Sequence, residues 1–144
     1  MTQGGIYMTP PPVPADVAAV FATHPRATRA QLMQVRALIY EVAADTDTGP
    51  LTETLKWGAP SYLTKATKSG TTIRLGQRRT DGRAAMFVHC QTALIDEFRD
   101  RFADQFEFDG NRALILPDDP ALDALAVCIA RALTYHRDNR KPVP

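Results

Sequence analysis

The sequence predicts an α+β fold, in which helices pack on an antiparallel sheet of about four to five short strands. Apolar residues recur at helical spacing near both ends of the chain, within 26–44 and 119–141. Between these segments, short runs that alternate apolar and polar residues are separated by Gly-containing turns, as in strands joined by hairpins. This order indicates a single α+β domain with two N-terminal helices and a closing C-terminal helix, and 144 residues are enough for one core.

Residues 1–14 are predicted to be a flexible, Pro-rich lead-in, and residues 15–141 to form the domain. The first residues have neither a basic segment nor an apolar segment of the kind found in a secretory signal. No apolar run approaches the roughly 20 residues that span a bilayer. Two cysteines, Cys90 and Cys128, make no disulfide framework, and free thiols are typical of a reducing compartment. We therefore expect a cytoplasmic protein without a membrane partner.

Two helices are expected in the first third of the chain. A short helix over about 15–22 should end before His24-Pro25, because the residue before a proline avoids the helical region. A longer helix follows over about 26–44, in which one apolar stripe recurs at helical spacing: Leu32, Val35, Ile39 and Val42. Residues 51–56 are then expected to form one or two helical turns.

The middle of the chain alternates like strands. Residues 70–77 and 84–90 show a period of two, and Asp81-Gly82 between them is a strong hairpin signal, so we predict an antiparallel pair. A helix over 92–106 follows, and then a short hairpin over 106–116 that turns at Asp109-Gly110-Asn111. The last helix is expected to begin with Asp119 as N-cap and Pro120 at its first position.

Charge is distributed unevenly along a chain whose net charge is only +1. Residues 56–83 contain seven basic side chains and one acidic side chain, a balance of +6. Residues 84–123 contain nine acidic and three basic side chains, a balance of −6. Binding of nucleic acid or of an acidic partner through the 74–83 hairpin, with Arg74, Arg78, Arg79 and Arg83, is one hypothesis. The modest net charge and the lack of aromatic residues between these arginines argue against it.

Most catalytic signatures are missing. Only two serines are present, without a nucleophile elbow, and His89 and Cys90 would point to opposite faces of a strand. The histidines show no metal-ligand spacing, and no nucleotide-binding glycine motif occurs. We therefore expect no catalytic residue and no cofactor, although a site assembled from distant residues stays open.

One acidic set has helical geometry. Within the predicted 92–106 helix, four carboxylates share an outward face: Asp96, Glu97, Asp100 and Asp104. Such a ridge is a candidate for weak binding of a hard cation through oxygen ligands. Alternatively, Arg99 and Arg101 neutralise it and leave an inert polar surface, which is the interpretation that we favour.

The segment LKWGAPSY, residues 55–62, is the leading candidate for a binding site. Gly58 permits unusual backbone angles, and large amphipathic rings can line a concave surface. With lysines on either side, an anionic or aromatic ligand would suit this segment. The predicted ligand-binding residues are Lys56, Trp57, Pro60, Tyr62 and Lys65. The alternative is that Trp57 anchors the core, as lone large aromatic residues in small domains usually do.

The same segment resembles the signature of a bacterial family, domain of unknown function 1801, or YdhG-like. The similarity covers about residues 28–136 and includes TIRLG (72–76), FVHCQTAL (87–94) and GNRALIL (110–116). It implies a compact α+β domain, and weak iron binding as an alternative function, since some members are described as frataxin-like iron chaperones. Many members have a Gly-Lys pair where this chain has Gly110-Asn111-Arg112.

Taken together, these patterns predict a non-enzymatic domain that binds a small molecule or a protein partner. The identity of that ligand and the oligomeric state stay open at the level of sequence.

Overall fold

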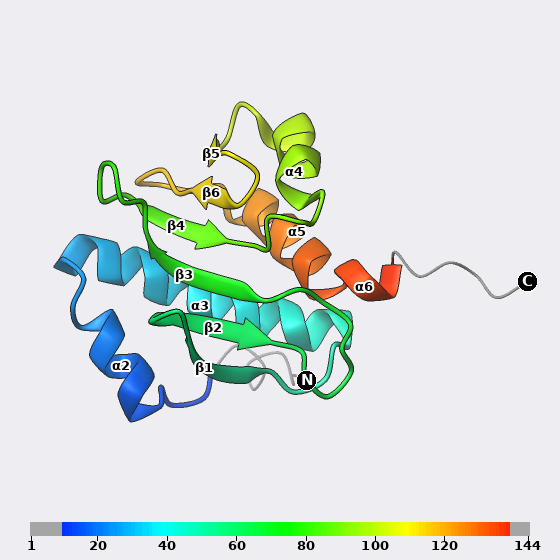
Figure 1. The fold of residues 1–144 in the computed structure, drawn as a ribbon, viewed down its shortest axis with the longest axis horizontal. Helices are drawn as coiled ribbons and strands as arrows, with labels where there is room; N and C mark the ends of the chain where they lie inside the picture. The colour runs from blue at the N-terminus through cyan, green and yellow to red at the C-terminus, as the bar shows by residue number, and fades with distance from the viewer. Residues whose placement is uncertain (1–9, 139–144) are drawn as a thin grey trace, which may run out of the picture.

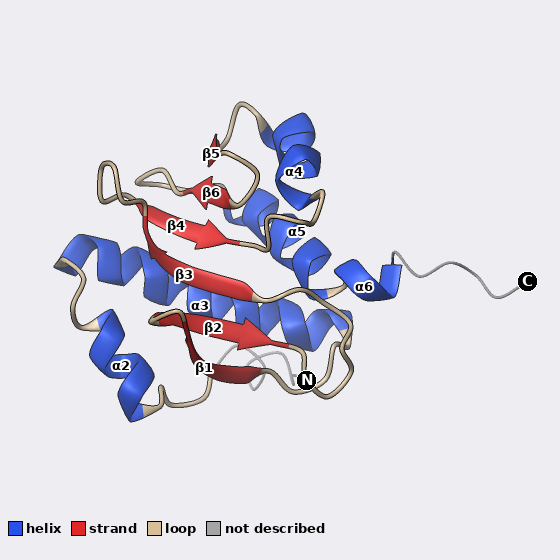
Figure 2. Ribbon diagram, in the orientation of Figure 1, coloured by secondary structure: helices blue, strands red, loops and turns tan. Residues whose placement is uncertain are grey.

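The computed structural model describes residues 10–138 and has one six-stranded sheet with five helices in that range (Figures 1 and 2). The helices are α2 (Ala15–Phe21), α3 (Arg26–Thr46), α4 (Leu94–Phe102), α5 (Leu122–Leu133) and α6 (Tyr135–Asp138). The strands are β1 (Thr52–Lys56), β2 (Ala59–Leu63), β3 (Ile73–Gln77), β4 (Ala84–Phe87), β5 (Glu107–Asp109) and β6 (Ala113–Ile115). The α+β class is thus confirmed, whereas the expected four to five strands were too few.

The strands lie in the order β1-β2-β3-β4-β6-β5, and every neighbouring pair is antiparallel. Helices α3 and α5 lie side by side behind one face of the sheet, while the face toward the viewer is left without a helix across strands β2 and β3 (Figures 1 and 2). This second face is called the open face below. Side chains from several neighbouring strands lie together on this face.

The core lies between the sheet and the two long helices. Strand residues that point to the helices are fully buried, as Ile73, Leu75 and Met86 show. The stripe predicted for the first long helix is buried throughout and meets the stripe of α5: Leu32, Val35, Ile39 and Val42 against Leu125, Ile129 and Leu133. Because successive strand residues point to opposite faces, this burial also fixes which residues lie on the open face.

Both predicted hairpins are confirmed. Strands β3 and β4 pair antiparallel around a turn that contains Gly82, whose φ is +73°. Strands β5 and β6 pair around Gly110, whose φ is +59°. Glycine reaches these positive angles without a side-chain clash, which explains why the Asp-Gly pairs were reliable turn signals.

Three local predictions were wrong. Residues 52–56 form strand β1 instead of helical turns, because they pair along their whole length with β2. Helix α5 begins at Leu122 and has no side-chain cap, so Asp119 is not its N-cap. Helix α4 ends at Phe102 and is shorter than the expected 92–106 helix. Positions 1–9 of the expected lead-in and positions 139–141 of the expected domain lie outside the described residues.

The loop over residues 64–71 is fastened to the end of α5. Backbone N–H of Thr71 donates to the Ala132 carbonyl at 2.9 Å, and the Ser69 hydroxyl donates to that of Leu133 at 2.9 Å. The Ser69 carbonyl in turn accepts from the N–H groups of His136 and Arg137 at 2.8 and 2.9 Å. Carbonyls at the end of a helix need such partners. The loop therefore caps the C-terminal end of α5, and these bonds fix its position beside the open face.

Among the described residues, no helix has the length and apolar character required to cross a bilayer.

Candidate functional site

Trp57 lies at the tip of the β1–β2 hairpin. Lys56 and Ala59 are paired across the strands, so Trp57 and Gly58 form a two-residue turn. Both have positive φ, +56° and +75°, as a type I′ turn requires. The Trp57 side chain is 91% exposed, so the alternative that it anchors the core is wrong. A bulky aromatic residue is a rare choice at this position, where Asn, Asp or Gly is usual.

Arg74 and Arg112 flank Phe87 on the open face. The sheet register places Ser61, Arg74, Phe87 and Ala113 in one row across four strands. The guanidinium carbons of Arg74 and Arg112 lie 6.0 and 5.8 Å from the centre of the Phe87 ring. Partial burial and the nearby positive charge of Arg112 lower the pKa of Arg74. Two like charges are therefore held together over one aromatic ring.

No carboxylate within residues 10–138 forms an ion pair with Arg74 or Arg112. Within the basic block of residues 56–83, Arg78 and Arg83 do form such pairs, whereas Arg79 is exposed and, like Arg74, forms none among the described residues. Arg78 pairs with Glu107 at 2.7 Å and also with Asp81, while Arg83 pairs with Glu107 at 2.7 Å. The charges of Arg78 and Arg83 are thus compensated, and the arginines of the 74–83 hairpin without an ion pair among the described residues are Arg79, exposed in the turn, and Arg74 on the sheet.

A hollow of about 210 Å³ adjoins Arg74, and we call it the central hollow. Its walls come from the β1–β2 hairpin, the start of β3 and the residues after β4: Lys56, Trp57, Thr72, Arg74 and His89. All of these side chains are cationic, aromatic, hydroxyl or imidazole groups, and none is acidic. The arrangement can accept an anion through Lys56 and Arg74 and an apolar ring against Trp57.

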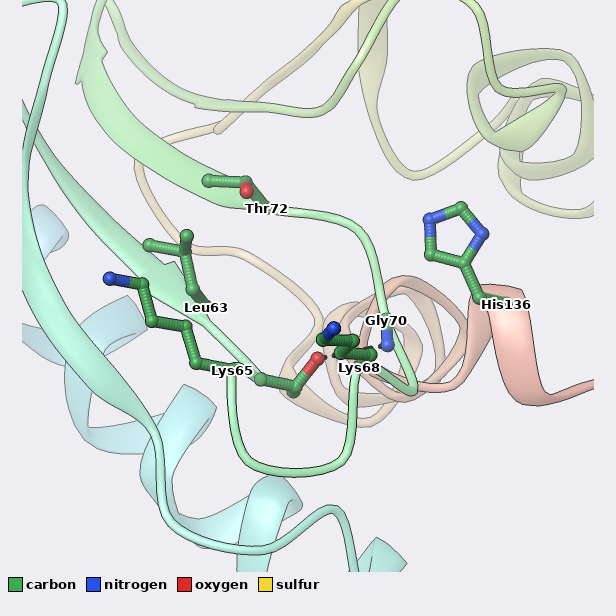
Figure 3. Close-up of a pocket in the computed structure, with 7 residues that line it drawn as sticks. Leu63, Lys65, Lys68, Gly70, Thr72 and His136 are labelled. Atoms are coloured by element: carbon green, nitrogen blue, oxygen red, sulfur yellow. Dashed lines mark hydrogen bonds between the residues drawn. The ribbon is translucent and has the colours of Figure 1, made fainter.

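A second hollow of about 220 Å³ lies at the 64–71 loop, and we call it the loop hollow. Figure 3 shows Lys65 and Lys68 on the loop, Thr72 on the neighbouring strand segment and His136 reaching in from α6. The Thr64 hydroxyl accepts the Gly70 N–H at 2.9 Å and closes the loop at its base. The loop hollow shares Thr72 with the central hollow, so the two are adjacent.

A third hollow of about 320 Å³ joins the other two, because it shares His89 with the central hollow and His136 with the loop hollow. Its remaining lining is polar or aromatic: Thr71, Gln91, Thr92 and Tyr135. His89 Nδ1 accepts the backbone N–H of Gln91 at 3.1 Å. The three hollows together form a trough, called the basic trough below.

The structure separates the five residues predicted to bind a ligand. Lys56 and Trp57 line the central hollow, and Lys65 lines the loop hollow. Pro60 is buried, and Tyr62 is fully buried on the helix side of the sheet, where its hydroxyl donates to Glu53 at 2.8 Å. Strand alternation explains the difference, since Tyr62 belongs to the face that points to the core.

The acidic residues on and after α4 do not gather. Asp96 pairs with Arg99 at 3.0 Å, and Glu97 pairs with Arg131 of α5 at 2.7 Å. The hydrogen bond from Arg131 lowers the pKa of Glu97. Asp104 lies beyond the last residue of the helix, so the expected row of four is broken. Within residues 10–138, no group of three or more His, Cys, Asp or Glu residues is placed to hold a metal ion.

Several residues of the trough and of the adjoining open face were absent from the predicted site. Phe87 and His89 were detectable, because alternation along 84–90 already sets them opposite Met86 and Val88. Arg112 and His136 come from distant segments, and only the pairing of β4 with β6 and the docking of α6 on the loop bring them near.

Comparisons of the chain with protein-family models, with curated proteins and with solved structures give no match.

Proposed function

We propose that this protein is a non-enzymatic domain that binds a small organic anion in the central hollow, next to Arg74. The observation that supports it is the pair Arg74 and Arg112, held over Phe87 with no acidic partner in the described part of the chain. Proteins seldom keep a half-buried positive charge uncompensated. An anion in the central hollow, beside Arg74, offsets this positive charge and supplies an acceptor for its N–H donors.

The family resemblance of segment 55–62 is compatible with this proposal, and membership in the YdhG-like family stays a proposal as well. The segment contains the end of β1, the Trp57-Gly58 turn and nearly all of β2. It therefore supplies two residues of the central hollow, Lys56 and Trp57. A partner-binding role or iron binding would use other surfaces, and the paired carboxylates of α4 do not favour iron.

Titration calorimetry with inorganic pyrophosphate at low ionic strength tests the proposal. We expect measurable binding that weakens as salt is added, because exposed charges are screened. Arg74→Ala should weaken it by roughly tenfold or more, since hydrogen bonds to charged groups contribute about 1.5–3 kcal/mol. Arg79→Ala is the matched control, because Arg79 is exposed in the β3–β4 turn and lines none of the three hollows. Equal binding by both variants would exclude this site.

A further inference from the structure

Building on the proposed function, we infer that the ligand belongs to the nucleotide class. Its planar ring stacks on Trp57, and its phosphate chain runs from Arg74 past Thr72 toward Lys65 and Lys68.

Trp57 carries the first part of this inference. Its ring makes no aromatic or cation–π contact within the described residues and is 91% exposed, so it adds little to the stability of the fold. It also has a left-handed backbone angle, φ +56°, which is strained for a residue other than glycine. A strained, exposed indole beside a cationic hollow is suited to stacking with a planar ring, as aromatic side chains stack on bases in nucleic-acid complexes.

The two neighbouring cationic hollows carry the second part. Lys56 and Arg74 line the central hollow, and Lys65 and Lys68 line the loop hollow, with Thr72 on the boundary. A single anionic group occupies one of these hollows and leaves the lysines of the other unsatisfied. Two or more linked phosphates fill both, and the Thr72 hydroxyl lies where it can donate to the bridging region.

The loop hollow is also preorganised. The Thr64 hydroxyl accepts the Gly70 N–H, the Ser69 hydroxyl donates to the Leu133 carbonyl, and Lys68 has φ +56°. A loop that is already ordered loses little conformational entropy when it binds a phosphate chain. This favours a polyphosphate over a ligand with one charge.

A mononucleotide fits the open face better than a nucleic-acid strand does. Besides Trp57, the only exposed large hydrophobic side chain in the described part is Leu122, which cannot stack a base. Phe87 is covered by Arg74 and Arg112, and the adjoining outward side chains form a small buried cluster: Ala85, Ala113 and Ile115. Strand-binding proteins offer successive aromatic platforms, whereas this face offers one.

Calorimetry with three probes tests the inference: ATP without added Mg²⁺, tripolyphosphate and AMP. We expect ATP to bind roughly tenfold or more tighter than tripolyphosphate, as stacking of one base requires. Trp57→Asn, which suits the turn, should remove that advantage without unfolding the protein. A Lys65→Ala, Lys68→Ala double variant should reduce the affinity for ATP at least tenfold and leave that for AMP within about twofold. Arg79→Ala should match the wild type with every probe.

The outcomes separate the inference from the proposal on which it rests. If neither ATP nor tripolyphosphate binds in a manner that depends on Arg74, anion binding itself is excluded. If tripolyphosphate binds as tightly as ATP and Trp57→Asn changes nothing, the anion site stands and the nucleotide class is wrong. If a single-stranded oligonucleotide binds much more tightly than ATP through the same residues, the occupant is a strand and the inference is overturned.

Discussion

The Arg36 guanidinium and the Glu53 carboxylate form a buried ion pair between helix α3 and strand β1, with Nε 2.6 Å from Oε2. Their side chains are only 2% and 5% exposed. The hydroxyls of Tyr40 and Tyr62 also donate to Glu53, at 3.2 and 2.8 Å, and Arg36 Nη2 donates to the Pro11 carbonyl at 2.7 Å. One carboxylate thus ties together α3, β1 and β2, within the hairpin that carries Trp57 at its tip.

Replacement of Glu53 by Ala should destabilise the protein by about 3–5 kcal/mol, because it leaves a buried guanidinium without its counter-ion. Urea unfolding followed by circular dichroism measures this loss. Tyr40→Phe is the matched control within the same network, since it removes one long hydrogen bond and should cost about 1 kcal/mol. A Glu53→Ala variant no less stable than Tyr40→Phe would contradict the assigned role of the ion pair.

The same network predicts how stability depends on acid pH. Burial acts to raise the pKa of Glu53, but hydrogen bonds from Arg36 and Tyr62 outweigh this effect. The pKa of Glu53 in the folded protein is therefore lowered. A carboxyl group whose pKa is lowered by folding stabilises the folded state at pH values above its pKa in the unfolded chain, about 4.3. That stabilisation is lost as the pH falls through the pKa of the group in the folded state. The free energy of unfolding should therefore fall below pH about 4.3.

Glu53→Gln isolates this contribution, because glutamine has no proton to gain. The difference in unfolding free energy between wild type and Glu53→Gln should be largest near neutral pH and shrink as the solution is acidified. Urea titrations at a series of pH values test this. A difference that stays constant from neutral to acid pH would assign the acid sensitivity to other carboxylates, such as Asp81, whose pKa the Arg78 hydrogen bond lowers to about 2.

Gly70→Ala should destabilise the fold strongly. A Cβ atom at this position would lie within 2.5 Å of the Ala132 carbonyl oxygen and still closer to that of Leu133, and backbone atoms cannot move aside cheaply. Overpacking of this kind costs about 1–3 kcal/mol or more. Gly76→Ala on β3 is the matched control, because its Cβ would meet Phe87 at an ordinary 3.6 Å. Thermal unfolding of the two variants should differ clearly, and equal midpoints would mean that the loop does not press on α5.

Trp57→Asn should stabilise the protein by about 0.5–1 kcal/mol, because Asn suits the first position of a type I′ turn. Gly58→Ala is the companion change: φ is +75° there, so a side chain should cost about 1 kcal/mol although no atom stands in its way. Urea unfolding decides both. A loss of stability in Trp57→Asn would show that the indole supports the fold, which would remove the reason to assign it to a ligand.

Patterns within single segments predicted most of the fold. The stripe Leu32–Val42 and the two Gly-centred hairpins were legible because each depends on local geometry. Strand β1 was misjudged, since its threonines pair with β2 only through a Trp-Gly turn that resembles no common hairpin signal. Turn preference is a weak guide where an unusual residue such as Trp57 occupies the turn.

The candidate site was predicted in part. The segment 55–62 contributes Lys56 and Trp57 to the central hollow, but Tyr62 turns inward to Glu53. Alternation along β2 places Tyr62 on the core face, and this was missed because no strand was predicted over residues 59–63. The proposal depends most on the charges of Arg74 and Arg112, which are far apart in the sequence. They come together only through the pairing of β3 with β4 and of β4 with β6, and sequence periodicity does not reveal these pairings.

The pairing of α3 with α5 sets the timing of folding during synthesis. Helix α3 ends at Thr46, whereas α5 spans Leu122–Leu133. The ribosome must therefore synthesise about half of the chain, including all six strands of the sheet, between the two helices. The β1–β4 meander can form by successive local turns meanwhile, because its contacts are close in sequence. The apolar stripe of α3 has only that half-built sheet to cover it. The nascent chain therefore exposes this stripe until α5 is released, and it is in this interval that the protein is open to aggregation or to capture by a chaperone.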